Sequence, residues 1–274
     1  MRGMQQRIGL NALIGGSLVG MLLLTIAIGL VWTPYDPIAI DLDHPLAPPS
    51  LAHWFGADEF GRDVLSRAML GARISASVAF ATVALAVGSG AIIGVCAGFL
   101  RGWTDRLLMM INDAILAFPS LLLALAVIAV LGPGRWSIVL ALSVAYVPSV
   151  VRLVRGAVLS VREREFITAS KVAGDGALYT MVRHVLPNVL PPITVLSTSL
   201  FGWVLLSESA LSFLGVGVPP PAPTWGNMLS ASRPYMETAT WLSVAPGLCI
   251  VATLLGINLL GDALRDWIDP RRDP

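Results

Sequence analysis

The amino-acid sequence predicts an all-α membrane protein with six transmembrane helices. Its 274 residues are 55% hydrophobic and only 13% charged, whereas soluble domains carry roughly 25% charged residues. Six apolar stretches approach the roughly 20 residues that cross a bilayer; they cover residues 8–32, 74–99, 107–131, 136–154, 187–207 and 241–260. Segments of this kind must be helical, because lipid offers no hydrogen-bond partner to backbone polar groups.

The distribution of basic residues predicts that both termini are cytoplasmic. Six spans place the two termini on one side, and 13 of the 18 basic residues then lie on that side, as the positive-inside rule requires. We expect the first span to be retained, because no small-residue cleavage site follows it. The net charge of +1 gives no indication of a nucleic-acid partner.

Three regions follow from these spans. Residues 1–72 are expected to hold the first helix and a long outer loop, residues 73–262 a core of five helices, and residues 263–274 a cytoplasmic tail. The outer loop is rich in proline and acid, and it ends in a segment where Asp63 and Arg67 have the spacing of a helical ion pair.

Glycine is expected to bring helices close together. It recurs at every fourth position in two spans, at Gly90, Gly94, Gly98 and Gly102 and again at Gly16 and Gly20. Small residues at this spacing let two helix backbones approach, so we predict a tight, crossed helix pair at each row.

The sequence disfavours an enzyme. It has no phosphate-binding loop and a single lysine, Lys171, so the chain has no ATP site of its own. Its three histidines lie outside the spans, which leaves no Ser–His pair within the bilayer. Cys96 and Cys249 have neither metal nor disulfide spacing and are expected to be packing residues. We expect no cofactor or metal on this chain.

Two acidic residues fall in or beside the spans. Glu208 lies at a membrane boundary, before the proline-rich segment 219–223. An ionisable group there is a functional candidate, and the alternative is a structural carboxylate hydrogen-bonded to a neighbouring helix. Asp113 lies about two helical turns from the cytoplasmic boundary, so we expect it to be structural.

The largest polar insertion between spans covers residues 155–187 on the predicted cytoplasmic side. Within it, residues 163–172 are compatible with a helix, and Gly174-Asp175-Gly176 should end that helix. A small soluble helix between two spans suits contact with a second protein that acts on the membrane domain.

Four segments, in order along the chain, resemble the permease subunits of bacterial ABC importers of the peptide and nickel family. They are residues 54–63, the insertion at 164–187, residues 211–217 with Trp225-Gly226, and residues 258–266 before Asp269-Pro270. The resemblance implies the type I ABC importer permease fold in the bacterial inner membrane. It also implies a second homologous permease, two ATPase subunits that bind ATP and Mg, and a periplasmic binding protein.

The insertion resembles the EAA loop of that family, which docks on the ATPase. The family's Glu-Ala-Ala falls on Thr168, Ala169 and Ser170, and its glycine falls on Gly174. The acidic residue is therefore missing, or its role has moved to Glu165. The expected coupling site comprises Glu165, Thr168, Ala169, Ser170, Gly174, Asp175 and Pro187. We expect Ala169, Ser170 and Gly174 to face the ATPase.

The resemblance implies import of di- and oligopeptides by alternating access, with ATP hydrolysed by the partner subunits. Glu208 and Ser212 become candidates for the translocation path. Import of nickel or a nickel chelate is the alternative within the family. A passive channel or a structural membrane protein is the alternative from another class, and neither needs a docking helix.

Overall fold

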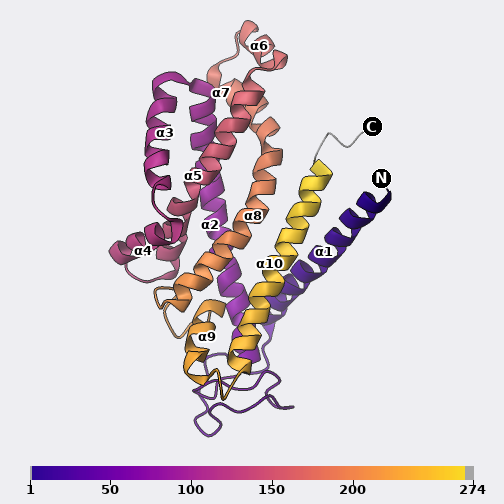
Figure 1. The fold of residues 1–274 in the computed structure, drawn as a ribbon, viewed down its shortest axis with the longest axis vertical. Coiled ribbons are helices and arrows are strands. Elements are labelled where there is room, and N and C mark those ends of the chain that lie inside the picture. Colours follow the sequence, from indigo (N-terminus) through magenta and orange to yellow (C-terminus); the bar gives the residue numbers. More distant parts are fainter. Residues whose placement is uncertain (1, 269–274) are drawn as a thin grey trace.

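The computed structural model describes residues 2–268, and nearly all of them outside the outer loop are helical (Figure 1). The elements are α1 (Arg2–Val31), α2 (Val64–Leu100), α3 (Gly102–Leu116), α4 (Ser120–Leu131), α5 (Arg135–Arg162), α6 (Glu165–Val172), α7 (Ala177–Thr180), the π-helical turn η1 (Met181–Val185), α8 (Leu186–Phe213), α9 (Trp225–Ser232), the 3-10 turn η2 (Arg233–Tyr235) and α10 (Trp241–Ile268). Five helical segments in this part of the chain are long and apolar enough to cross a membrane: α1, α2, α5, the run from α7 to α8, and α10.

The third predicted span is not a straight helix. It is divided into α3 and α4, which meet at 92°, so the count of six holds only if this bent pair is one span. The break falls at Phe118-Pro119. Proline lacks the N–H that would continue the helix, and it disfavours helical backbone angles at the residue before it. The proline was visible in the predicted span, but the bend was not predicted from it.

α2 begins before its predicted span, and α5 ends after its own. The outer loop and the polar insertion are therefore both shorter than expected. α2 has 37 residues and starts at Val64. Asp63 caps it by accepting a hydrogen bond of 2.8 Å from the backbone N–H of Ser66. The predicted ion pair between Asp63 and Arg67 is therefore wrong. Arg67 pairs with Asp58, with 3.3 Å between Nε and Oδ2.

The centre of the fold is a seam between α2 and α5, where the glycine row of α2 allows close approach. The seam pairs Gly90 with Val150, Gly94 with Val154 and Gly98 with Val158. A Cβ added at Gly94 would lie 2.7 Å from the Cβ of Val154, closer than two carbon atoms can pack. The predicted tight pair is confirmed for these three glycines, whereas a Cβ at Gly102 would meet nothing within 4 Å.

The second predicted glycine row does not make a helix contact; the neighbouring Gly15 makes it instead. α1 packs against α10 through Gly15, where an added Cβ would lie 2.8 Å from the backbone nitrogen of Leu260. Gly16 and Gly20 meet nothing within 4 Å. The spacing in the sequence predicted a contact but did not fix which face of α1 makes it.

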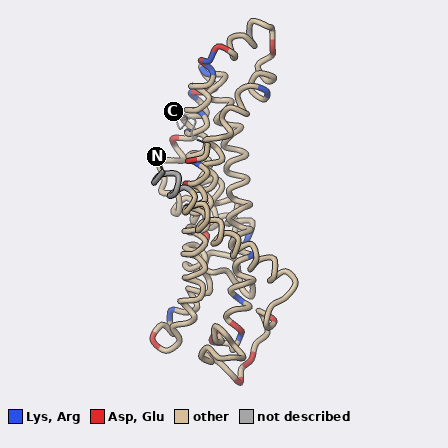
Figure 2. Tube along the Cα trace, turned by 90° about the vertical axis from the view of Figure 1, so that its right-hand side faces the viewer, with Lys and Arg blue, Asp and Glu red and all other residues tan. Residues whose placement is uncertain are grey.

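The long axis of the molecule separates two poles (Figure 1). α6 and α7 form one pole, and the outer loop covers the other. The N-terminal end of α1 and the C-terminal end of α10 lie nearer the α6 pole than the outer loop (Figure 1), as expected if both termini are cytoplasmic. Charged residues are most frequent near the two poles, and fewer lie between them (Figure 2).

Candidate functional site

The candidate coupling site is a short helix held at the end of the molecule. The polar segment between the long helices is shorter than the predicted 155–187, because α5 continues to Arg162 and α7 begins at Ala177. Within it, α6 is anchored by Ile167, whose side chain is completely buried. Gly174 then reverses the chain with a φ of +87°, a conformation that favours glycine and ends helices.

Ser170 faces the interior of the subunit. Its hydroxyl donates a 2.6 Å hydrogen bond to Oδ2 of Asp175 and lies 3.2 Å from the hydroxyl oxygen of Thr180. The backbone N–H of Asp175 also donates to the carbonyl of Ser170, at 3.1 Å. The expectation that Ser170 faces a partner is therefore not met by its side chain. Instead, Ser170 and Asp175 tie the end of α6 to α7.

The opposite face of α6 is open. Glu165, Thr168 and Ala169 are exposed, and so are two apolar side chains, Phe166 and Val172, the latter with 84% of its surface accessible. Glu165 lies in the first turn, where a negative charge interacts favourably with the helix dipole. α6 thus presents a mixed apolar and acidic surface away from the membrane helices.

The remaining two loop residues differ in their surroundings. Gly174 is exposed, and a Cβ added there would meet nothing within 4 Å. Pro187 is the second residue of α8, which directly follows the π-helical turn η1. Pro187 therefore belongs to the helical run that begins at Ala177, and the polar segment itself ends before it.

Glu208 and Ser212 lie inside the packed subunit. Both side chains are buried, and the Ser212 hydroxyl donates a 2.8 Å hydrogen bond to Oε1 of Glu208. Oε2 has no hydrogen-bond partner among residues 2–268. α9 closes over this region, since a Cβ at Gly226 would lie 2.7 Å from the Cβ of Ser212. Glu208 is therefore enclosed in the subunit, and its hydrogen bond comes from its own helix, not from the neighbouring helix that the structural alternative expected.

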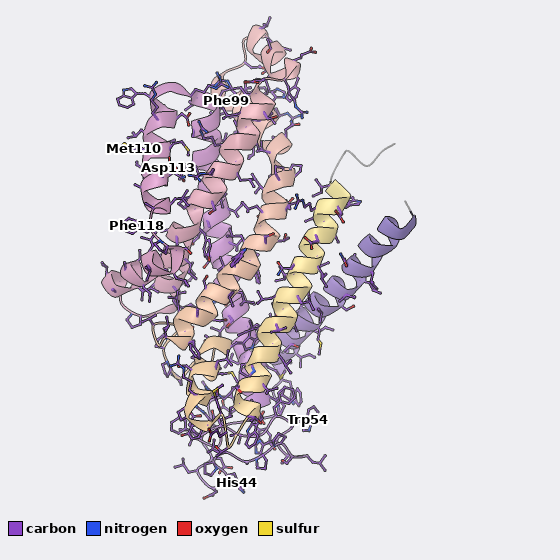
Figure 3. The ribbon with its side chains drawn as sticks, viewed as in Figure 1. His44, Trp54, Phe99, Met110, Asp113 and Phe118 are labelled. Carbon is purple, nitrogen blue, oxygen red and sulfur yellow. The ribbon has the colours of Figure 1, made fainter. Side chains whose placement is uncertain are left out.

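Two ion pairs join α3 to α5, and the sequence did not predict either. Arg155 binds Asp105 through two hydrogen bonds, of 2.6 and 2.7 Å. Arg152 donates from Nη2 to Oδ1 of Asp113 at 2.8 Å, and Figure 3 labels Asp113 on α3, beside α5. Detecting these pairs requires knowing that α3 packs against α5. Ile167 was missed for the same reason, because nothing in its local sequence separates an anchor from an exposed residue.

This architecture is that of a transport protein's membrane subunit: a bundle of spanning helices with a short anchored helix at one pole. The family model for the binding-protein-dependent transport system inner membrane component matches residues 90–274. The match covers more than half of the chain, so the protein belongs to this family and is a multi-pass component of the inner membrane.

Relatives support the assignment over most of the chain. The di/tripeptide transport system permease protein DppC of Pseudomonas aeruginosa (strain UCBPP-PA14) is 42% identical over 265 residues, covering 94% of this chain and 88% of that protein. The glutathione transport system permease protein GsiD of Escherichia coli O6:K15:H31 (strain 536 / UPEC) is 41% identical over 253 residues, covering 92% and 84%. The predicted membership of the ABC importer permeases is confirmed.

A solved structure confirms the fold. A chain of the MetNI methionine ABC transporter, in an inward-facing conformation, superposes with a TM-score of 0.59 at 19% sequence identity. The match covers 73% of this chain and 94% of that chain. The predicted importer permease fold is therefore correct, with the bent α3–α4 pair as the departure from six straight helices.

Proposed function

We propose that this chain is the permease subunit of an importer that moves di- and oligopeptides across the inner membrane. The relatives named above support peptides as the substrate class, since they are di/tripeptide and glutathione permeases. Neither of these two is a nickel permease, so the nickel alternative lacks comparable support. The transport path would form between this chain and a second homologous permease, with substrate delivered by a periplasmic binding protein.

The proposed coupling mechanism rests on α6, which has one buried anchor and an exposed outer face. Ile167 fixes the helix to the subunit, while Phe166 and Val172 expose apolar surface at the pole. Exposed apolar side chains rimmed by polar ones mark protein-binding sites. We assign this face, with Glu165, Thr168 and Ala169, to an ATPase subunit. Ser170, Asp175 and Gly174 would hold the helix in position. ATP and Mg would be bound and used entirely by the two ATPase subunits.

A reconstituted system tests the function. The chain is coexpressed with the second permease and the ATPases, purified and placed in proteoliposomes with the binding protein. We expect ATP-dependent uptake of a labelled dipeptide, which should stop when either the ATPases or the binding protein is omitted. Uptake of nickel but not of dipeptide would favour the alternative substrate. Uptake without any ATPase would contradict an ATP-driven importer.

Cross-linking tests the docking face separately. In a background with Cys96→Ala and Cys249→Ala, Val172→Cys should form disulfides with cysteines placed across the ATPase surface. Leu51→Cys is the control, because its side chain is almost fully exposed on the outer loop at the other pole. A cross-link from Leu51→Cys, or none from Val172→Cys with or without ATP, would show that α6 is not the ATPase contact.

A further inference from the structure

The ion pair between Asp113 and Arg152 is exposed within the membrane-spanning part of the subunit. The side chains are 56% and 63% accessible, respectively. α5 has 28 residues and is about 42 Å long at 1.5 Å per residue, and Arg152 lies about 25 Å from its outer end. A hydrocarbon core roughly 30 Å thick contains that position wherever along α5 it lies. The pair is therefore at membrane depth, whereas the count of basic residues in the sequence assigned Arg152 to the cytoplasmic side.

Lipid does not cover such a pair, because intramembrane charges face protein or a water-filled cavity. The rest of the exposed stripe of α5 favours water. Toward the α6 pole the stripe carries Ser149, Arg152, Gly156 and Ser160, whereas toward the outer pole it carries Leu140 and Val144. This polar half of the stripe is compatible with a water-filled cavity that opens toward the α6 pole.

The neighbouring ion pair, between Arg155 and Asp105, has the burial and hydrogen bonding of a structural salt bridge. Arg155 and Asp105 are only 30% and 17% accessible and share two hydrogen bonds. In the described chain, Arg152 and Asp113 share one hydrogen bond, and exposed pairs of this kind contribute little to stability. One pair therefore holds α3 to α5, and the other is available to exchange its partners.

We propose that Asp113 and Arg152 form a contact site for zwitterionic peptides in the translocation path. The Asp113 carboxylate would receive the ammonium of the peptide, and the Arg152 guanidinium would receive its carboxylate. When no peptide is bound, the two side chains neutralise each other, as they do in this structure. This inference rests on the proposed peptide transport, and it assigns the path to the exposed face of α3 and α5, not to Glu208.

Thiol labelling of the full transporter tests whether the site is hydrated. In nanodiscs, with Cys96 and Cys249 replaced by alanine, Arg152→Cys should react with a charged methanethiosulfonate reagent. Millimolar alanyl-alanine should slow that reaction several-fold. Phe80→Cys, an exposed apolar position of α2, should not react. Absence of labelling at Arg152→Cys with and without ATP would show that protein or lipid covers the pair, and would overturn the proposal.

A double-mutant cycle separates substrate contact from a structural bridge. If each residue contacts one end of the peptide, Asp113→Asn and Arg152→Gln should each slow dipeptide uptake about fivefold, and the double variant should be slower than either. Recovery of uptake in the double variant would overturn the proposal, because it would identify a bridge needed only for its own pairing. Asp105→Asn with Arg155→Gln is the matched control, which should show that recovery.

Dipeptide uptake by the wild-type protein in the same proteoliposomes distinguishes failure of the proposed function from failure of the contact site. If it does not take up dipeptide, the proposed function fails whatever the labelling shows. If it transports dipeptide while the single variants transport at the wild-type rate, only the contact site fails.

Discussion

The seam between α2 and α5 and the face of α6 use small and apolar residues in opposite ways. In the seam, three glycines remove side chains so that valines of the other helix fill the space. On α6, one buried isoleucine holds the helix while Phe166 and Val172 remain exposed. The seam is complete within this subunit, whereas the α6 surface is complete only when another protein covers it. Substitutions in the seam should therefore affect folding, and substitutions on the outer face of α6 should affect coupling.

The largest effect is expected in the seam, from Gly94→Leu. Any side chain at Gly94 would overlap Val154 and the carbonyl oxygen of Val151. Overpacking costs about 1–3 kcal/mol, and a leucine on a contact this tight should reach about 3 kcal/mol. Thermal unfolding in detergent should show a lower midpoint. Gly88→Leu is the control on the same helix, since a Cβ there meets nothing within 4 Å. Equal losses in both variants would mean that the seam is not specially packed.

The next effect is expected at the anchor of α6, from Ile167→Ala. Deleting a buried isoleucine costs about 2–5 kcal/mol, and less where the surroundings can relax. At this pole we expect about 2 kcal/mol, confined to α6 and α7. Hydrogen exchange should accelerate over residues 165–180 while the helices of the seam stay protected. Acceleration throughout the protein would show that the pole and the seam unfold as one unit.

A smaller effect is expected from Ser170→Ala, which removes the hydrogen bonds between α6 and α7. The hydrogen bond to Asp175 at 2.6 Å is the main loss. A bond to a charged group contributes about 1.5–3 kcal/mol when buried, and because Asp175 is only half-buried we expect the loss to lie at or below the lower end of that range. The same hydrogen-exchange measurement should show a weaker acceleration than Ile167→Ala does. If Ser170→Ala abolished ATPase binding and left exchange unchanged, its side chain would have to contact the partner.

The smallest effect on folding is expected from Thr168→Glu. Thr168 is exposed in the first turn of α6, where surface changes stay within about 0.5 kcal/mol and a negative charge is favourable. Exchange over α6 should be unchanged. Peptide-stimulated ATP hydrolysis should change instead, rising if the ATPase offers a basic residue there and falling if it offers an acidic one. Faster exchange over α6 would show that Thr168 is part of its fold.

Local patterns in the sequence were sufficient for five of the spanning helices and for the position of α6. Apolar runs, Gly174 and the polar composition around residues 163–176 act over a few residues, so their consequences could be predicted directly. Patterns that define a face were less informative. The spacing of Gly16 and Gly20 predicted close packing on α1, yet the contact is made by Gly15, because only the partner helix determines which face is used.

The division between sequence and structure is clearest for the charged residues. The sequence by itself determined the membrane class and a helical polar segment on one side, since composition, hydrophobic length and local turn signals decide these. It indicated the family through four segments that resemble the importer permeases. Only the tertiary structure decided that Glu208 is enclosed, that Ser170 faces inward, and that Asp113 meets Arg152 across 39 residues of chain. Burial and ion pairing depend on which helices become neighbours, and that depends on contacts between residues far apart in the sequence.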